Sequence, residues 1–260
     1  MENNFNVIEY QNSGKFSIDL SDKNDITISI KNDAKIDLDL VNFSDSCDLK
    51  IFAQKGSLCN LRILLKDKPK NIVLHANLDE KSEFNVYFAD FSLGNSTFNS
   101  HIILLGDGAK SEFKFSSFNT FNYTKKYNLS YDHIGLKTTS NLEGYGVCLK
   151  DSLLTVNGVS HIEKDSIKSS ATQKIKAILF DETSGAIANP ILKIDCDDII
   201  ANHACAIGSL NDDHIFYLLS RGIKLEEARK LITYGYLSPI KEHFEEKEKE
   251  EIQNLIEGDL

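Results

Sequence analysis

The fold class is decided by two short stretches, Ile26-Thr27-Ile28-Ser29-Ile30 and Ile36-Asp37-Leu38-Asp39-Leu40. In both, apolar and polar residues alternate strictly, which places the apolar side chains on one face of an extended strand. Between them, Lys31-Asn32-Asp33 supplies polar residues of the kind that favour a turn. The sequence therefore predicts two strands joined by a short turn, each with one buried face.

Short runs of alternating apolar and polar residues continue to about Ile200. A new run begins about every ten residues, and no helical period lies in between. This pattern indicates an all-β architecture, either a sandwich or barrel, or a β-solenoid of stacked strands. Asn, Asp, Ser and Phe recur at comparable places in successive runs, which favours the solenoid. The further runs occupy residues 61–65, 72–78, 84–88, 98–104 and 113–118.

The last part of the chain has a helical pattern instead. Asn211-Asp212-Asp213 is typical of a helix N-terminus, and Arg221-Gly222 of a helix C-terminus. Two more helices are expected, at about 225–236 and, after Pro239, at about 240–256. We therefore expect three parts, which are a short N-terminal segment (1–24), a β-solenoid core (25–200) and a C-terminal helical domain (201–260).

Composition limits the possible partners. The 260 residues carry a formal net charge of −10, which argues against a general affinity for nucleic acid or anionic membranes. The N-terminus lacks the pattern of a secretory signal, and no window approaches the roughly 20 apolar residues that cross a bilayer. The five cysteines are odd in number and irregularly spaced, so a disulfide framework is not expected. These features predict a cytoplasmic protein.

A specific order of motifs lies near the C-terminus. Residues 189–208 read Asn-Pro-Ile-Leu-Lys-Ile-Asp-Cys-Asp-Asp-Ile-Ile-Ala-Asn-His-Ala-Cys-Ala-Ile-Gly, residues 216–223 read Phe-Tyr-Leu-Leu-Ser-Arg-Gly-Ile, and residues 226–228 read Glu-Glu-Ala. Upstream, Tyr131-Asp132-His133-Ile134 adds a further element. This order resembles the C-terminal signature of the SufB/SufD family, whose members belong to the SUF iron–sulfur cluster assembly system.

The resemblance implies a right-handed parallel β-helix followed by a small helical domain. Family members pair through their β-helices, SufB with SufD, and each helical domain docks one copy of SufC, an ABC-type ATPase. Where the SufB type carries a cysteine this chain has Ser184, and where SufB has Glu after the signature His it has Ala204. The resemblance therefore implies a SufD-like, non-catalytic scaffold in a SufBCD complex, with a SufB-like subunit and a SufC-like ATPase as partners.

His203 is the family site that transfers most directly, because the corresponding SufD histidine lies at the SufB–SufD interface and serves the nascent cluster. Cys205 lies two residues further on, which places both side chains on the same face of a strand, and imidazole and thiolate both bind iron. His203 and Cys205 are therefore candidate metal ligands for a transient iron–sulfur cluster, with no stably bound cofactor expected. The simpler alternatives are a hydrogen-bonding histidine and small buried thiols, the latter also expected for Cys196.

The SufC-docking surface is expected on the C-terminal helices, because exposed aromatic side chains and arginines often anchor interfaces. An alternative is that part of this segment forms a small apolar core that caps the end of the solenoid. The candidate docking residues are Phe216, Tyr217, Arg221, Tyr234 and Tyr236. The candidate capping residues are Phe216, Leu219, Leu231 and Ile232.

The sequence leaves two alternative functions open. A homodimeric, SufB-like scaffold paired with SufC alone is one alternative, although Ser184 and Ala204 argue against it. A β-helix polysaccharide lyase or hydrolase is another, and Asp195, Asp197 and Asp198 are the nearest approach to the carboxylate cluster that it needs.

Two further kinds of site lack the residues that they require. Residues 106–111 resemble a phosphate loop but have Ala109 in place of the glycine before the lysine, so no ATP hydrolysis by this chain is expected. Five scattered histidines show no zinc-hydrolase spacing, and they are His75, His101, His133, His161 and His214.

Overall fold

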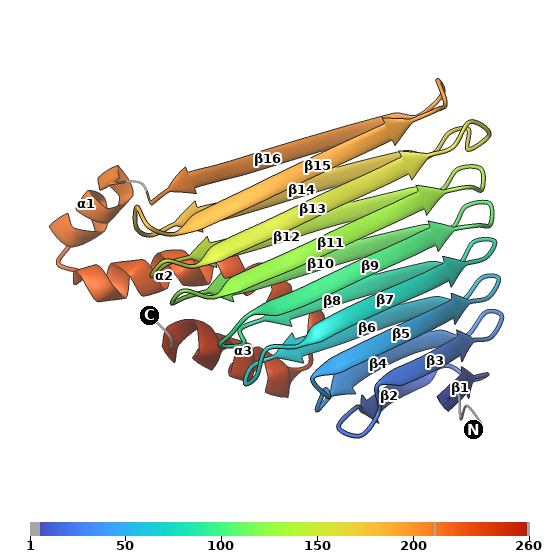
Figure 1. The fold of residues 1–260 in the computed structure, drawn as a ribbon, viewed down its shortest axis with the longest axis horizontal. Helices are drawn as coiled ribbons and strands as arrows, with labels where there is room; N and C mark the ends of the chain where they lie inside the picture. Colours follow the sequence, from blue (N-terminus) through green and yellow to red (C-terminus); the bar gives the residue numbers. More distant parts are fainter. Residues whose placement is uncertain (1–5, 211, 259–260) are drawn as a thin grey trace.

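The computed structural model describes residues 6–210 and 212–258, which fold into two eight-stranded parallel sheets followed by helices (Figure 1). Sheet A contains, in spatial order, β1 (Asn6–Tyr10), β3 (Asp25–Ile30), β5 (Ser46–Ala53), β7 (Asn71–Leu78), β9 (Ser96–Leu104), β11 (Thr124–His133), β13 (Leu153–Ile162) and β15 (Gly185–Ile194). Sheet B contains β2 (Gly14–Asp19), β4 (Lys35–Val41), β6 (Leu58–Leu65), β8 (Glu83–Asp90), β10 (Lys110–Asn119), β12 (Thr139–Cys148), β14 (Ser170–Leu179) and β16 (Ile200–Ser209). Because the chain alternates between the sheets, the expected β-solenoid is confirmed.

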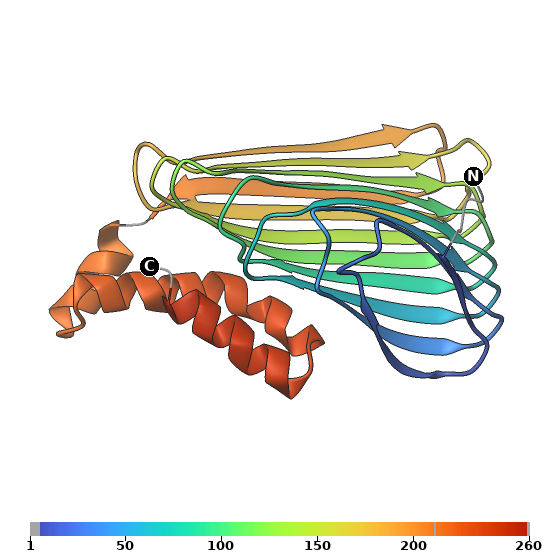
Figure 2. The same cartoon turned by 60° about the horizontal axis from the view of Figure 1, so that its bottom comes forward.

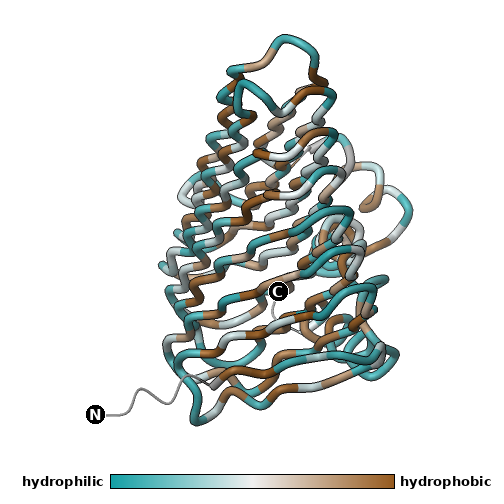
Figure 3. The backbone as a smooth tube through the Cα atoms, turned by 90° about the vertical axis from the view of Figure 1, so that its right-hand side faces the viewer, coloured by the Kyte–Doolittle hydropathy of each residue, from teal (hydrophilic) through white to brown (hydrophobic). Residues whose placement is uncertain are grey.

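Alternation of buried and exposed residues places the core between the two sheets. Ile28, Leu38 and Leu49 are fully buried, and β9 alternates buried with half-buried residues along its whole length. Figure 3 shows the same alternation of apolar and polar residues along the stacked strands. The strands expected at 26–30 and 36–40 are therefore present, with their apolar faces turned inward.

The turns stack on one another as regularly as the strands. Lys81 has a φ of 54° and its backbone N–H donates to the Asp107 carbonyl of the next turn at 2.9 Å. Gly108 has a φ of 70° and donates in the same way to Leu136 at 2.8 Å. Residues 106–109 therefore form a stacked solenoid turn that leads into β10, which explains the two glycines without any phosphate.

The solenoid extends past both of its expected boundaries. Strands β1 and β2 lie before residue 25 and pair with β3 and β4, so the N-terminal segment already belongs to the sheets from residue 6 onward. At the other end β16 continues to Ser209, so the last strand includes residues assigned to the helical domain by sequence. Strand length also grows along the solenoid, from six residues in β3 to ten in β14.

The helices are α1 (Asp212–Ser220), α2 (Leu225–Leu237), the 3₁₀ helix η1 (Ser238–His243) and α3 (Glu246–Gly258). Gly222 has a φ of 83°, which confirms the left-handed residue expected after the first helix. The third expected helix is divided, because Phe244 is extended between η1 and α3. The expected N-cap residue Asn211 lies outside the described residues. No helix in the described parts of the chain is long and apolar enough to span a membrane.

The helices lie along the side of the solenoid and do not cover its end (Figure 2). Their buried apolar residues pack against aromatic side chains on the outer face of sheet B, such as Tyr87 and Phe118. The alternative in which the helices cap the end of the solenoid is therefore wrong, because their buried apolar residues pack against the side of sheet B. The buried helical residues of the interface are Leu237, Ile240, Phe244, Ile252 and Ile256.

Candidate functional site

The last turn of the solenoid has two unpaired strand edges. Strand β15 pairs with β13 and β16 pairs with β14, and no further strand of residues 6–210 or 212–258 adds to either. Every residue of β16 except Ala201 is exposed, whereas every residue of the preceding strand of the same sheet, β14, is buried or half-buried. The two strands are the uppermost in Figure 1. One end of the solenoid is therefore open.

Register places His203 and Cys205 on the inner face of this open end. Their partners on β14 are Gln173 and Ile175, which are 1% exposed and point between the sheets. Because paired residues of neighbouring strands share a face, His203 and Cys205 also point toward the space between the sheets, where no later turn covers them. We call the inward-facing residues of β16 and β15 the open mouth, and they are Ala201, His203, Cys205, Ile207, Ala186, Ala188, Pro190, Leu192 and Ile194.

Within the open mouth, the two candidate ligands present an imidazole and a thiol to solvent. Partial burial raises the pKa of the Cys205 thiol, so it stays protonated at neutral pH unless a cation is close. As the side chains stand, no three His, Cys, Asp or Glu residues of the described chain are arranged to hold a metal ion. Within the described chain, His203 and Cys205 are therefore not part of a three-residue metal site.

Cys196 and the acidic residues around it belong to the turn between β15 and β16. Cys196 is half-buried there and is not part of β16. The Asp195 carboxylate accepts a hydrogen bond from His161 at 2.8 Å, and the Asp198 carbonyl accepts one from the Lys168 backbone N–H at 2.6 Å. Asp195 thus contacts β13 through its side chain, and Asp198 contacts the turn after β13 through its backbone.

Gln173 is a residue of the open end that the sequence did not single out. Its Nε2 crosses between the sheets and donates to Ser160 Oγ at 2.9 Å and to the Ile191 carbonyl at 3.2 Å. Its Oε1 is buried without a hydrogen-bond donor among the described residues, beside the space left by Gly158. The sequence feature that could have indicated Gln173 is its position as a lone polar residue on the inward face of strand 170–179, between Ala171 and Ile175.

The residues expected to dock an ATPase divide into two groups. Phe216 and Tyr217 on α1 are 72% and 56% exposed, and the Arg221 guanidinium lies 5.1 Å from the Tyr217 ring centroid. Tyr234 and Tyr236 are half-buried, since Tyr234 accepts a hydrogen bond from Lys241 of η1 and Tyr236 packs edge-on against Tyr145 of the solenoid. Only the first group forms an exposed surface.

The alternative capping role of the helices is contradicted for most of its residues. Phe216, Leu219 and Leu231 are each more than 40% exposed, so they do not form a small core. Leu231 lies instead in a groove of about 670 Å³ between α2 and α3. Ile232 packs against the apolar contact with sheet B.

Comparison with known proteins accounts for this combination of fold and site. Residues 8–236 match the family model described as the SUF system FeS cluster assembly, SufBD core domain. The chain belongs to the SufBD family. This match begins within β1, includes every later strand of the solenoid through β16, and ends near the end of α2.

Individual relatives agree with the family and with its SufD type. The chain is 35% identical over 138 residues to the Bacillus subtilis iron–sulfur cluster assembly protein SufD, which covers 53% of this chain and 31% of the relative. It is 21% identical over 178 residues to a SufBD family protein of Staphylococcus epidermidis, covering 68% of this chain and 38% of the relative. The matched regions therefore span less than two fifths of these relatives.

The position that distinguishes the SufB type is buried in this SufD-type chain. Ser184, which stands where a SufB-type cysteine is expected, lies immediately before β15 and is 7% exposed. Its hydroxyl donates to the carbonyl groups of Cys148 at 3.2 Å and Asp181 at 3.1 Å. A hydroxyl held in this way stabilises the turn and supplies no thiolate.

Proposed function

We propose that this chain is a SufD-like, non-catalytic scaffold subunit for iron–sulfur cluster assembly. It pairs with a SufB-like subunit through the open end of the solenoid, and it docks a SufC-like ATPase through its C-terminal helices. The observation that carries the proposal is the open mouth, where the family's histidine is exposed on an unpaired terminal strand.

Pairing is favoured by the unsatisfied backbone of the last turn. The N–H groups of Ile200 and Leu210 donate to carbonyls on the β14 side, so the N–H groups of the odd-numbered residues in between point away from β14. Such a row of free donors and acceptors is a template for another strand. Exposed apolar side chains flank it, and they are Ile187, Ile191, Ile194, Ile200 and Ile207.

The nascent cluster is the cargo of this interface. His203 and Cys205 supply an imidazole and a thiol that suit iron, but two donors do not complete its coordination. A partner subunit facing the open mouth would supply the remaining ligands, which agrees with transient binding. Since partial burial raises the pKa of Cys205, its thiol must lose a proton when it binds iron.

The ATPase surface is proposed on α1 and the groove beside α2. Phe216, Tyr217 and Arg221 project from α1, while the groove combines apolar Leu231 with the charged residues Glu227 and Lys230. In Figure 1, α1 lies near the end of β16, so an ATPase docked on α1 would be close to the terminal strand of the open mouth.

A proline scan of the terminal strand tests the pairing. Ala201→Pro removes an N–H that points to the free edge, so it should abolish co-purification with a SufB-like partner while leaving the thermal unfolding midpoint within a few degrees. Asn202→Pro removes an N–H on the β14 side and should lower that midpoint instead. Co-purification of the Ala201→Pro chain at the wild-type level would refute pairing through this edge.

The same edge is open to a second copy of this chain. Light scattering of the isolated protein tests this alternative. A stable homodimer that Ala201→Pro dissociates, and that a SufB-like partner does not displace, would favour the homodimeric scaffold and overturn the SufD-like assignment of partners.

A further inference from the structure

A row of imidazoles and carboxylates crosses the outer face of sheet A. His101 on β9, Asp132 on β11 and His161 on β13 come from three neighbouring strands, and Asp195 follows β15. His101 Nε2 lies 2.6 Å from Asp132 Oδ2, His161 Nδ1 lies 3.6 Å from Asp132 Oδ1, and His161 Nε2 lies 2.8 Å from Asp195 Oδ2. We call these four residues the His–Asp row.

The contact with Asp195 fixes the tautomer of His161. A carboxylate oxygen only accepts hydrogen bonds, so Nε2 carries the ring proton in the neutral imidazole. In that neutral tautomer, Nδ1 presents a lone pair to the Asp132 carboxylate at 3.6 Å. Two acceptors that face each other in this way create a place where a cation is stabilised.

We propose that the His–Asp row binds a divalent transition-metal ion through His101, Asp132 and His161. Two imidazoles and one carboxylate form a donor set that suits such ions. Asp195 does not bind the ion itself but orients His161, because a histidine ligand usually donates its other ring N–H to a carboxylate. This site lies on the outer face of sheet A, whereas His203 and Cys205 point between the sheets, so it is independent of the open mouth and of the proposed function.

The spacing of the donors is close to that of a metal site. Metal–ligand distances of about 2.0–2.1 Å in tetrahedral geometry separate neighbouring donors by about 3.3 Å. The observed separations of 2.6 and 3.6 Å lie on either side of this value. As the side chains stand they do not converge on one point, so binding requires the two imidazoles to turn toward a common centre and His101 to give up its Nε2 proton.

The surroundings support a site that is held in place but accessible. The side chains of His101, Asp132 and His161 are 38%, 31% and 30% exposed, and β9, β11 and β13 are each paired on both sides. Donors on such rigid strands keep their spacing. The His75 ring adds an imidazole at the edge of the row, with its centroid 6.2 Å from that of His101.

Calorimetric titration with Zn²⁺ tests the proposal on the full chain carrying His203→Ala and Cys205→Ser, which removes the donors of the open mouth. We expect saturable binding that His161→Asn or Asp132→Asn weakens at least tenfold. Co²⁺ should give visible absorption bands that the same substitutions abolish.

A matched pair of substitutions tests whether Asp195 orients His161. Asp195→Asn should weaken Zn²⁺ binding about tenfold, while Asp197→Asn, an exposed carboxylate in the same turn, should leave it unchanged. The proposal is overturned if the chain without the open-mouth donors binds no Zn²⁺. It is also overturned if the two ligand substitutions, Asp195→Asn and the control Asp197→Asn all have the same effect. Thermal melts of each variant establish that the fold is intact.

Discussion

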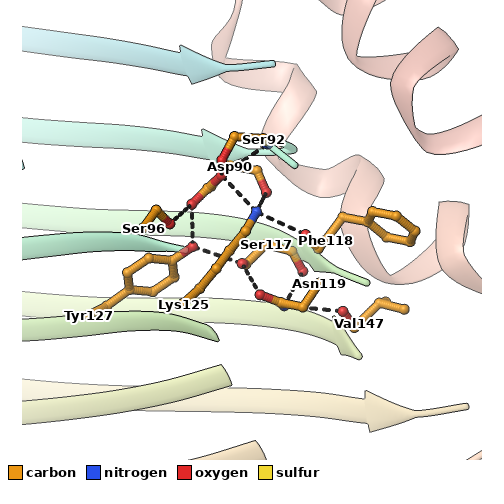
Figure 4. Close-up of polar contacts among 9 residues, drawn as sticks. All are labelled: Asp90, Ser92, Ser96, Ser117, Phe118, Asn119, Lys125, Tyr127 and Val147. Carbon is orange, nitrogen blue, oxygen red and sulfur yellow. Dashed lines mark hydrogen bonds and ion pairs between the residues drawn. The ribbon is translucent and has the colours of Figure 1, made fainter. Parts of the chain in front are cut away.

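Replacing Lys125 by methionine removes a cation from the interior of the solenoid. Lys125 and Asp90 are 1% and 0% exposed, and Lys125 Nζ donates to Asp90 Oδ1 at 2.7 Å (Figure 4). The same ammonium also donates to the carbonyl groups of Asp90 at 3.0 Å and Phe118 at 2.9 Å. The substitution therefore leaves a buried carboxylate and two carbonyls without their strongest donor.

The magnitude follows from what remains around the carboxylate. Breaking a buried ion pair by removing one partner costs about 3–5 kcal/mol. Asp90 keeps hydrogen bonds from Ser92, Ser96 and Tyr127, which offset part of the cost of the bare charge. The two carbonyls add to the loss at about 1 kcal/mol each. We expect Lys125→Met to lower the free energy of unfolding at pH 7 by about 4 kcal/mol.

The loss should depend on pH. Burial by itself raises the pKa of Asp90, but Lys125 and the hydroxyl donors outweigh it and hold this pKa below its ordinary value. In the wild type the ionised carboxylate therefore stabilises the fold above pH 4, and this contribution is lost only as the pH falls through the lower folded-state pKa. In Lys125→Met the neutral acid is favoured, so acid relieves the penalty and the difference between the two proteins should shrink as the pH falls from 7 toward 4.

Urea unfolding followed by circular dichroism measures both quantities. Lys174→Met is the matched control, because it removes a lysine from an ion pair on the surface of the same solenoid, 2.7 Å from Glu143. The control should cost under about 1 kcal/mol. A Lys125→Met loss below 1 kcal/mol, or a difference that grows as the pH falls, would refute the reasoning.

Three further predictions follow from other parts of the molecule. His133 is buried and its pKa is lowered to about 4, mainly by burial. Because its neutral form is favoured in the folded state, about 3 kcal/mol of the free energy of unfolding should be lost between pH 6.5 and pH 4. His133→Gln should flatten the pH dependence of stability in this range, as measured by urea titrations. Gly144→Ala should cost about 1–3 kcal/mol, since a Cβ there would lie 2.0 Å from the Phe115 ring, whereas Gly208→Ala, with nothing within 4 Å, should leave the thermal midpoint unchanged. His203→Ala should slow cluster maturation by the reconstituted complex without dissolving the complex, and a normal maturation rate would contradict the role of this histidine.

Strand periodicity made most of the fold predictable. In the stretches at 26–30 and 36–40 the sequence alone determines which face of the strand is buried, because the apolar residues of an alternating strand all lie on one side. The helices after residue 211 were predictable for the same reason, because their pattern depends on nearby residues alone. The place where they pack could not be predicted, since an apolar helix face specifies only that it is buried, and the aromatic residues that bury it lie far away in the sequence on sheet B.

Register decides which polar residues meet, and register is hard to obtain from one sequence. The spacing of His203 and Cys205 predicted a shared face, and the pairing with Gln173 and Ile175 places that face inward. The histidines at 101 and 161 appear scattered in the sequence. They flank one aspartate only because each solenoid turn returns the chain to the same height in the sheet.

The taper of the solenoid determines which end has more to gain from a partner. Strands near the N-terminus have five or six residues, whereas every strand from β10 onward has ten. A longer edge offers more backbone groups to a partner strand, and the open mouth also offers the exposed isoleucines of β15 and β16. The helices leave this end uncovered because they pack against the side of sheet B. Strand length and helix placement therefore both favour assembly at the end that carries His203.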